Sequence, residues 1–331
     1  MSNAVTTRVT LVIPVYNEAD VIVAHLREIV ARARPSNADY DLELLLIDDG
    51  STDGTAQALA DFCQAHPFAR HIGFTRNFGK EAAIQAGLDH ARGDAVVVLD
   101  SDLQHPPALI PHMVELWRSG ALVVEACKTH RGRESLAAGL LARGFYRLFH
   151  RIAELDLRDQ SDYKLLDRSV VDQYRQLKER HRFFRGLVQW MHFPAARIPF
   201  EVPERAGGSS RWSRLALLRY AVHGITAFSA APLALVSWCG LFTLVVGTVF
   251  GGLALIQKIR GDALDGFTTV ILLLIFFSGT LMLSLGIVGH YLARIYEEIK
   301  CRPGYVLRPP LLPADSPAGL PARPPSSGAA P

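Results

Sequence analysis

The stretch VVVLDSDLQHPP, from Val96 to Pro107, decides the predicted fold. It opens as an apolar run typical of a buried strand and then presents two carboxylates, Asp100 and Asp102, one residue apart. Strands that are apolar throughout occur in parallel sheets that helices cover on both faces. Ligands of such open sheets bind at the carboxyl ends of the strands. The stretch therefore predicts an α/β fold whose ligand site contains two acids.

Three earlier segments repeat this pattern, which strengthens the prediction of a mostly parallel sheet. Apolar runs end in the polar loops PVYNE (residues 14–18), DDGSTDGT (48–55) and TRNFGK (75–80). Helical periodicity follows the loops, over residues 18–33, 50–66 and 79–93. We expect Gly93 to end the third of these helices. The four loops are expected to converge on one edge of the sheet.

The loop sequences exclude two common phosphate-binding classes. A dinucleotide oxidoreductase of this fold carries a G-x-G-x-x-G turn after its first strand, whereas residues 14–20, PVYNEAD, contain no glycine. The P-loop pattern is absent as well. A divalent cation can balance phosphate charge instead, and the carboxylates of Asp100 and Asp102 are hard oxygen ligands that suit Mg²⁺ or Mn²⁺. The edge of the sheet is therefore predicted to hold a nucleotide diphosphate through a metal.

Two long segments in the last third of the chain predict membrane-spanning helices. Residues 220–257 and 266–293 contain no Asp, Glu, Lys or Arg, and each exceeds the roughly 20 residues that cross a bilayer. The alternative of two buried core helices is disfavoured, because globular helices are rarely apolar all round over this length. Basic residues flank the pair, at Arg211, Arg214, Arg219, Arg294, Lys300 and Arg302. The positive-inside rule then predicts that both flanks and the preceding domain are cytoplasmic.

Other features of the chain narrow the choice of partners. The first strand-like run begins near residue 8 with no apolar helix before it, so we expect no secretory leader. A formal net charge of +3 over 331 residues does not suggest a nucleic-acid partner. The basic flanks of the spans suit an anionic membrane surface instead. The four cysteines lack metal-type spacing and are expected to be free thiols.

Several motifs together point to one enzyme family. VIPVYNE, LLIDDGSTDGT, RNFGKEAA and DSDLQHPP resemble the motifs of family 2 glycosyltransferases with the GT-A fold. The chain is most similar to the polyprenyl-phosphate glycosyltransferases, which include dolichyl-phosphate mannose synthases and bacterial undecaprenyl-phosphate glucosyltransferases. The likeness continues through ERHRFFRGLVQWMHF, ERAGGSSR, GITAFSAAPL and GHYLARIYEEIKCRPGYV, and so covers about residues 10–306. It implies inverting transfer of a sugar from a nucleotide-sugar to a polyprenyl phosphate, with glucose and UDP as first choices.

The resemblance also implies how the chain is divided. A Rossmann-like GT-A domain with a mostly parallel sheet would be followed by interfacial helices and two transmembrane helices. The expected divisions are 1–205 for the cytoplasmic transferase domain, 206–229 for the acceptor loop and juxtamembrane helices, 230–257 and 267–290 for the spans, 258–266 for a short outer loop, and 291–331 for a cytoplasmic end with a disordered Pro-rich tail.

The resemblance assigns seven residues to the nucleotide-sugar pocket. These are Pro14, Tyr16, Glu18, Asp49, Lys80, Asp100 and Ser101. It implies Asp102 and Gln104 as the direct ligands of Mg²⁺ or Mn²⁺. Asp100 belongs to the same metal set but would lie nearer the sugar-nucleotide.

For catalysis the resemblance points to Asp102, Asp162, Arg205 and Arg211. The two arginines match basic residues of a loop that closes over the diphosphate and the acceptor. Asp162 is either a general base or a group that orients the sugar or the metal. We favour orientation, because an ionised lipid phosphate needs placement more than deprotonation.

The resemblance implies that the acceptor phosphate meets Arg131, Arg133, Lys164 and Arg205. Lys164 lies in SDYK, residues 161–164, where relatives commonly have G-D-F-R. Lysine keeps the charge of arginine but loses its bidentate grip on phosphate. The stretch EACKTHRGR, residues 125–133, departs from the usual arginine-rich segment, so it leaves open which of Lys128, Arg131 and Arg133 meets the phosphate.

Two rival functions are compatible with parts of this sequence. A processive polysaccharide synthase of the same fold would carry a Q-x-x-R-W element and more spans, whereas Gln189 and Trp190 are adjacent here. A non-enzymatic membrane scaffold with a degenerate transferase domain is the second rival, and the complete set of acids argues against it. The lipid bilayer is an expected partner in every case, and relatives suggest a homotetramer.

Overall fold

A computed structural model describes residues 7–34, 39–128, 160–180, 182–200, 231–260 and 267–309. Within them, the apolar runs form one seven-stranded sheet of order β3-β2-β1-β4-β6-β5-β7. Its strands are β1 (Arg8–Val15), β2 (Asp41–Asp48), β3 (Ala69–Gly73), β4 (Ala95–Val98), β5 (Val123–Lys128), β6 (Gln160–Asp167) and β7 (Ala195–Phe200). β6 runs antiparallel to its neighbours β4 and β5, and the other pairs are parallel.

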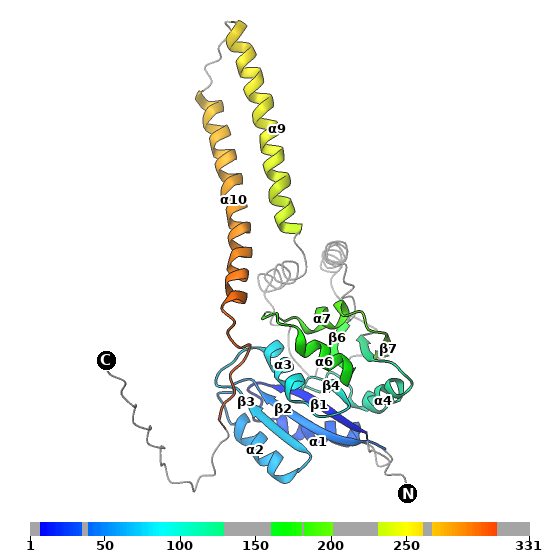
Figure 1. The fold of residues 1–331 in the computed structure, drawn as a ribbon. Helices are drawn as coiled ribbons and strands as arrows, with labels where there is room; N and C mark the ends of the chain where they lie inside the picture. The colour runs from blue at the N-terminus through cyan, green and yellow to red at the C-terminus, as the bar shows by residue number, and fades with distance from the viewer. Residues whose placement is uncertain are drawn as a thin grey trace, which may run out of the picture.

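Helices cover both faces of the sheet, because successive side chains of a strand point to opposite faces. The covering helices are α1 (Ile22–Ala33), α2 (Thr55–Ala65), α3 (Lys80–His90), η1 (Pro107–Leu109), α4 (Ile110–Arg118), α6 (Arg168–Gln176) and α7 (Phe184–Trp190). Leu11 and Ile13 of β1 enter a core with α1, α2 and α4. Val12 enters a second core with α3, α6 and α7, on the side of the sheet nearer the two long helices (Figure 1). The predicted mostly parallel α/β architecture is confirmed.

The predicted end of the third helix is wrong. α3 ends at His90 with Ala91 as its C-terminal cap, and Gly93 lies beyond it. A Cβ atom at Gly93 would lie 2.7 Å from both Thr10 N and Ala95 O. Glycine is therefore required there for close packing against β1 and β4, and not to stop the helix.

The strands β1 and β4 separate towards their carboxyl ends, and we name this opening in the edge of the sheet the crevice. Chain connections leave this pair in opposite directions across the sheet, which is where open α/β sheets bind ligands. β1 pairs with β2 as far as Val15, but its pairing with β4 ends at Val12 and Val98. Val12 O accepts a hydrogen bond from Leu99 N, and Pro14, two residues later, has no N–H to continue on that side. The proline therefore helps to open the sheet edge between the two strands.

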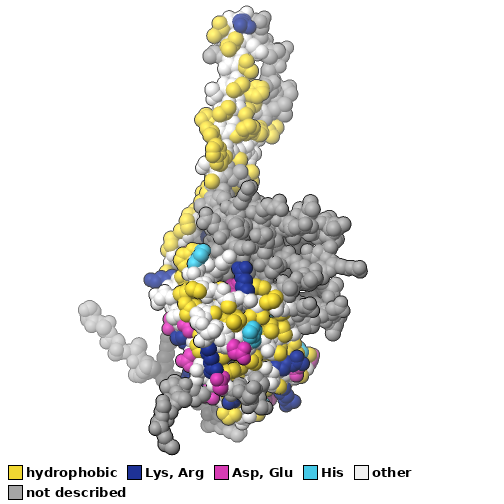
Figure 2. All heavy atoms as spheres, turned by 90° about the vertical axis from the view of Figure 1, so that its right-hand side faces the viewer, with side chains coloured by type: hydrophobic (Ala, Val, Ile, Leu, Met, Phe, Trp, Pro, Cys, Tyr) yellow, Lys and Arg dark blue, Asp and Glu magenta, His cyan; other side chains and the backbone are white. Residues whose placement is uncertain are grey.

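Two long helices project from the sheet domain. α9 (Ala231–Arg260) and α10 (Phe267–Ile299) lie side by side (Figure 1). By length and composition, each could cross a membrane, over the windows Val236–Leu253 and Leu273–Ile299. Large apolar side chains along them are exposed, and Figure 2 shows hydrophobic atoms over the projecting pair. A soluble protein would bury such surfaces, so the pair associates the chain with a membrane.

The chain beyond α10 returns to the sheet domain. Arg308 N donates to Gly73 O at 2.7 Å, and Thr75 N donates to Val306 O at 3.0 Å, beside the edge strand β3. The ring of Tyr305 stacks on Phe74 with centroids 5.1 Å apart. These contacts connect the foot of α10 directly to the loop that follows β3.

Candidate active site

The loops after β1 and β2 are held together by hydrogen bonds. Asn17 adopts a φ of 53°, and its N–H donates to Ser51 Oγ at 3.0 Å. Asn17 Oδ1 in turn accepts from Thr52 N at 2.9 Å. Glu18 N donates to Thr55 Oγ1 at 2.9 Å, at the start of α2. The backbone of the first loop is thus fixed before any ligand binds.

Glu18 connects this pair of loops to the loop after β4. Its Oε1 accepts a hydrogen bond from Ser101 Oγ at 2.8 Å, and its Oε2 is buried with no hydrogen-bond partner within the described residues. Burial raises the pKa of Glu18, and the nearby charge of Asp102 adds to the rise. A buried carboxylate oxygen with no donor is costly unless a ligand satisfies it. Glu18 therefore faces a place where a hydroxyl, an amide or a cation would bind.

Asp49 organises the loop between β3 and α3. Its carboxylate accepts hydrogen bonds from Phe78 N at 2.7 Å and Gly79 N at 2.9 Å. The next residue, Gly50, has a φ of +69°, and a Cβ atom there would lie 2.2 Å from the carbonyl carbon of Arg76. The two loops can pack this closely only because residue 50 has no side chain. Asp49 thereby sets the position at which α3 begins.

A chain of alternating charges crosses the crevice from β4 to α7. Lys80 Nζ, at the first residue of α3, lies 2.5 Å from Asp100 Oδ1 and 2.7 Å from Asp162 Oδ2. Asp162 comes from β6 and also receives Arg185 of α7, whose Nε lies 2.5 Å from Asp162 Oδ1. The Asp162 side chain is only 6% exposed, whereas Lys80 is 42% and Arg185 33% exposed. The carboxylate is thus the buried centre, and both cations keep accessible surface.

The pKa shifts follow from this arrangement. Burial would raise the pKa of Asp162, but the hydrogen bonds and charge of Arg185, together with those of Lys80, hold it well below its ordinary value. Burial would lower the pKa of Lys80, but the charges of Asp162 and Asp100 raise it. Asp162 and Lys80 are therefore both charged at neutral pH. Asp162 is a poor proton acceptor in this state, because both of its oxygens contact cations.

Asp102 differs from Asp100 in that it is exposed. Its Oδ1 accepts a hydrogen bond from Gln104 N at 3.1 Å across Leu103, which has a φ of 58°. Asp102 and Gln104 therefore lie in one tight turn around Leu103. Within the described residues, no three His, Cys, Asp or Glu side chains lie close enough together to bind a metal ion.

Comparisons with known proteins show which family the chain resembles. The family model described as Glycosyl transferase family 2 matches residues 10–175. The chain is 37% identical over 304 residues to the uncharacterized glycosyltransferase YkcC of Bacillus subtilis, covering 90% of this chain and 93% of that protein. It is 33% identical over 303 residues to the SfII prophage-derived bactoprenol glucosyl transferase of Shigella flexneri, covering 91% and 97%.

The chain belongs to glycosyl transferase family 2. It is accordingly a transferase, and its mostly parallel sheet fits the expected GT-A fold class. A solved mannosyltransferase of Pyrobaculum calidifontis, in complex with GDP-Man and Mn²⁺, is similar at 19% identity with a TM-score of 0.41, covering 85% of this chain and 88% of that one.

Most of the residues predicted for this family 2 transferase's donor site lie around the one crevice. Pro14 lies in β1, Tyr16 and Glu18 follow that strand, and Asp100 and Ser101 follow β4. Tyr16 is 44% exposed, so its ring is available to a ligand. Asp49 differs from these residues, because both of its carboxylate oxygens already accept hydrogen bonds from the backbone. A direct contact between Asp49 and the base stays a prediction.

The expected role of Lys164 needs correction. Its side chain is fully buried, and its ammonium group is paired with the carboxylate of Glu125 on the neighbouring strand β5. Burial lowers the pKa of Lys164, while the charge of Glu125 opposes that shift. An acceptor phosphate cannot reach this ammonium group without breaking a buried ion pair, which is costly. Lys164 is therefore a core residue in this structure. Four other predicted residues, Arg131, Arg133, Arg205 and Arg211, lie outside the described residues.

Sequence reasoning missed Arg185 and Glu81. Glu81 follows Lys80 on α3, and its Oε2 accepts a hydrogen bond from Phe184 N at 2.8 Å. Burial raises the pKa of Glu81 to about 7. Both residues lie in quoted family-like motifs, RNFGKEAA and ERHRFFRGLVQWMHF, but neither motif predicts that α3 and α7 meet. Only the packing of α7 beside β6 reveals that Arg185 belongs to the site.

Proposed function

We propose that this transferase moves glucose from UDP-glucose to a polyprenyl phosphate at the cytoplasmic face of a membrane, with inversion at the anomeric carbon. The observation that carries the proposal is the 33% identity to a bactoprenol glucosyl transferase over nearly the full length of both chains. The matched length includes both candidate spans, and so supports a lipid-linked acceptor as well as a sugar donor.

The reaction exchanges one bond for another at the sugar. The bond between the anomeric carbon and the diphosphate oxygen breaks, and the nucleoside diphosphate leaves with the bonding electrons. An oxygen of the lipid phosphate forms the new bond from the opposite side. That phosphate is already ionised at neutral pH, so catalysis depends on placing it and on stabilising the leaving charge.

Lys80 and Arg185 are suited to this task. Each is anchored on the buried carboxylate of Asp162 and keeps part of its surface exposed. A cation held in place by an ion pair loses little further freedom when a phosphate oxygen arrives. Asp162 would then act as an anchor that orients the two cations, which fits the low pKa of its carboxyl group. The low pKa argues against a general base, while the groups that Asp162 orients here are two cations and not the sugar or the metal that the resemblance implies.

The residues beside the crevice fit a divalent cation in part. Asp102 presents an exposed carboxylate, Gln104 is its neighbour in the same turn, and Glu18 Oε2 is a buried oxygen that receives no hydrogen bond from the described residues. Asp100 fits less well, because its carboxylate is already paired with Lys80. We propose that Asp102 and Gln104 hold Mg²⁺ or Mn²⁺ and that donor phosphate oxygens supply further ligands. The metal, when bound, neutralises charge on the departing diphosphate.

The long helices fit a lipid acceptor. A polyprenyl tail leaves the bilayer only at a cost of roughly 0.8 kcal/mol for each exposed CH₂ group. The sugar site must therefore come to the lipid head group. Basic residues at the foot of α10, such as Lys300 and Arg302, favour a cytoplasmic location for the transferase domain. A homotetramer is also proposed, and cross-linking in native membranes would test it.

A transfer assay tests the proposed function. The purified full-length protein in lipid nanodiscs is given undecaprenyl phosphate, Mg²⁺ or Mn²⁺, and each of a panel of radiolabelled nucleotide-sugars. We expect a single labelled lipid, formed fastest with UDP-glucose. A preference for another sugar would overturn the glucose assignment, and the absence of any labelled lipid would favour the scaffold. A labelled polymer of increasing length would instead identify a processive synthase.

A further inference from the structure

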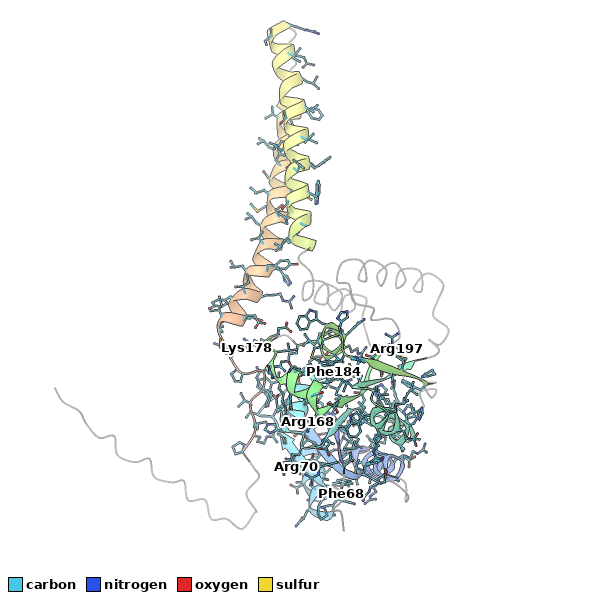
Figure 3. All side chains as sticks on the ribbon, turned by 45° about the vertical axis from the view of Figure 1, so that its right-hand side comes forward. Phe68, Arg70, Arg168, Lys178, Phe184 and Arg197 are labelled. Atoms are coloured by element: carbon cyan, nitrogen blue, oxygen red, sulfur yellow. The ribbon has the colours of Figure 1, made fainter. Side chains whose placement is uncertain are left out.

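A pocket of about 360 Å³ lies at the foot of α10, away from the crevice. Its walls come from the loop between α6 and α7, from the chain around the end of α10 and from Gln85 of α3, and Figure 3 shows Lys178 beside the end of α10. The pocket shares no residue with the charged chain of the active site. The charge-free part of α10 ends at Ala293, five residues before the pocket residue Glu298, a distance of about 8 Å along a helix. The pocket therefore lies where the helix leaves the membrane, at the level of lipid head groups.

Cations dominate the lining of this pocket. Four basic side chains, Lys178, Arg180, Arg182 and Arg302, face two acidic ones, Glu179 and Glu298, which leaves a net charge of +2. The number of charged groups is high for a space of this size. Ligand pockets are usually mostly apolar with few polar groups, so this lining indicates a charged ligand.

The positive charge is not neutralised within the described part of the chain. None of the four basic side chains forms an ion pair there, although ion pairs are common elsewhere in the domain. The carboxylate of Glu298 accepts hydrogen bonds from the backbone N–H of Arg180, at 3.1 and 3.2 Å, and not from a basic side chain. Among the described residues, the guanidinium of Arg180 donates to the backbone carbonyl of Glu297, at 3.4 Å, and to no carboxylate.

Arg182 is held in a similar way. Its guanidinium donates to the carbonyl oxygens of Tyr174, Leu177 and Glu179, and it lies over the ring of Tyr174 at 5.2 Å. Carbonyl groups and an aromatic face fix the position of the cation without removing its charge. The pocket thus contains prearranged cations in excess over its two carboxylates, and a bound anion would reduce the repulsion between them.

We infer that this pocket binds the phosphate of an anionic membrane lipid. Arginine is well matched to phosphate oxygens, which it contacts in a bidentate manner, and basic pockets at the cytoplasmic ends of membrane helices take up anionic head groups. The ligand class is a lipid phosphate, from either a phospholipid or a polyprenyl phosphate held outside the reaction centre. The inference goes beyond the proposed function and does not depend on it.

Binding would also affect the position of the transferase domain. The pocket includes Gly304, the residue before Tyr305, which stacks on the loop after β3. Its opposite wall precedes α7, which carries Arg185. A lipid phosphate in the pocket would therefore join the foot of α10 to the loop that leads into α7. The active site would then be held at a fixed height below the bilayer.

The test measures lipid binding by the full-length protein and not transfer. Native mass spectrometry counts the lipids retained by protein from nanodiscs of phosphatidylcholine, with phosphatidylglycerol or undecaprenyl phosphate added in separate arms. The variants are Arg180→Gln, Arg302→Gln and the double substitution. Lys300→Gln is the matched control, because Lys300 lies at nearly the same depth but stacks on Tyr296 at 4.0 Å and does not line the pocket.

We expect each pocket substitution to weaken retention of phosphatidylglycerol about fivefold, and the double substitution to multiply the two effects. Lys300→Gln should change retention by less than about twofold. Loss only in the undecaprenyl phosphate arm would identify the acceptor lipid as the occupant and would still support the inference. Equal losses in Lys300→Gln, unchanged retention in the double variant, or full competition by inorganic phosphate would overturn it. Arg302 is exposed, so Arg302→Gln serves as the folded variant if Arg180→Gln is unstable.

Discussion

The guanidinium of Arg185 holds the carboxylate of Asp162 through two hydrogen bonds, from Nε to Oδ1 at 2.5 Å and from Nη2 to Oδ2 at 2.8 Å. This two-point contact fixes the orientation of a carboxylate that is almost completely buried. Lys80 approaches the same carboxylate from α3. One carboxylate of β6 thus binds a cation from α7 and a cation from α3.

Arg185→Lys should lower the transfer rate by at least about tenfold, and Arg185→Ala by about 10² to 10³. Lysine keeps the charge but cannot make the two-point contact, and alanine leaves Asp162 with Lys80 as its partner. Transfer kinetics and thermal unfolding of both variants provide the measurement. Arg197→Ala is the control, because Arg197 is 60% exposed and lies 3.5 Å from Glu125. Near-normal transfer by a folded Arg185→Ala variant would contradict the role.

Asp162→Asn should reduce transfer at every pH without changing the shape of the pH profile. The pKa of Asp162 is held below its ordinary value by Arg185 and Lys80 against the effect of burial, so the group stays ionised from about pH 5 to pH 8. Its stabilising contribution is present above the unfolded pKa and is lost only as the pH falls through the lower folded pKa. An acidic limb in the wild-type profile that disappears in Asp162→Asn would identify a general base instead.

Glu81→Gln should stabilise the protein more at pH 8 than at pH 5. Burial raises the pKa of Glu81 to about 7, so the folded state favours the neutral form. The cost of ionising it is absent below the unfolded pKa, grows as the pH rises, and is complete above about pH 7. Glutamine removes this cost and can still accept the hydrogen bond from Phe184 N, so we expect a gain of about 2 kcal/mol at pH 8 after solvent screening.

Thermal unfolding of Glu81→Gln at the two pH values checks this expectation. Glu115→Gln is the control, since Glu115 is 75% exposed on α4. A stability difference that does not change with pH would show that Glu81 titrates normally.

Gly50→Ala should destabilise the protein by more than about 2 kcal/mol and raise the KM for the donor. Alanine at this position would combine a left-handed backbone with a Cβ atom 2.2 Å from the Arg76 carbonyl carbon. Gly120→Ala provides the comparison, because Gly120 has a φ of +109° but nothing within 4 Å of its Cβ position. Chemical denaturation of both variants separates backbone strain from steric overlap. Equal losses in the two variants would mean that contact between the loops is unimportant.

Asp102→Ala should abolish transfer and leave the protein folded and inserted in membranes. Asp102 is exposed, and the hydrogen bond to its side chain comes from the neighbouring Gln104, so its removal costs little stability. A chelator should have the same effect on the wild type, and added Mg²⁺ or Mn²⁺ should restore transfer. Asp61→Ala on α2 is the control for a lost surface carboxylate. Transfer by Asp102→Ala at a near-normal rate would remove the metal assignment.

The order of strands and helices, the crevice-side acids and the two apolar helices follow from local patterns in the chain. Apolar runs without charges, such as residues 95–99, have few alternatives to a buried strand when helices alternate with them. Long charge-free segments likewise have few stable states outside a bilayer. Asp100, Ser101 and Glu18 could be predicted to meet, because parallel strands bring their carboxyl ends to one edge.

Other features depend on packing between distant segments, and no local pattern encodes it. Lysine is a common phosphate ligand, but strand β6 directs the side chain of Lys164 towards the core, where it pairs with Glu125. Arg185 has no motif of its own, and it reaches Asp162 only because α7 packs beside β6. The sequence therefore determined which chemical groups are available. The tertiary structure decided which charged groups are paired in the core and which are exposed at the site, because packing sets the direction in which each strand or helix presents its side chains.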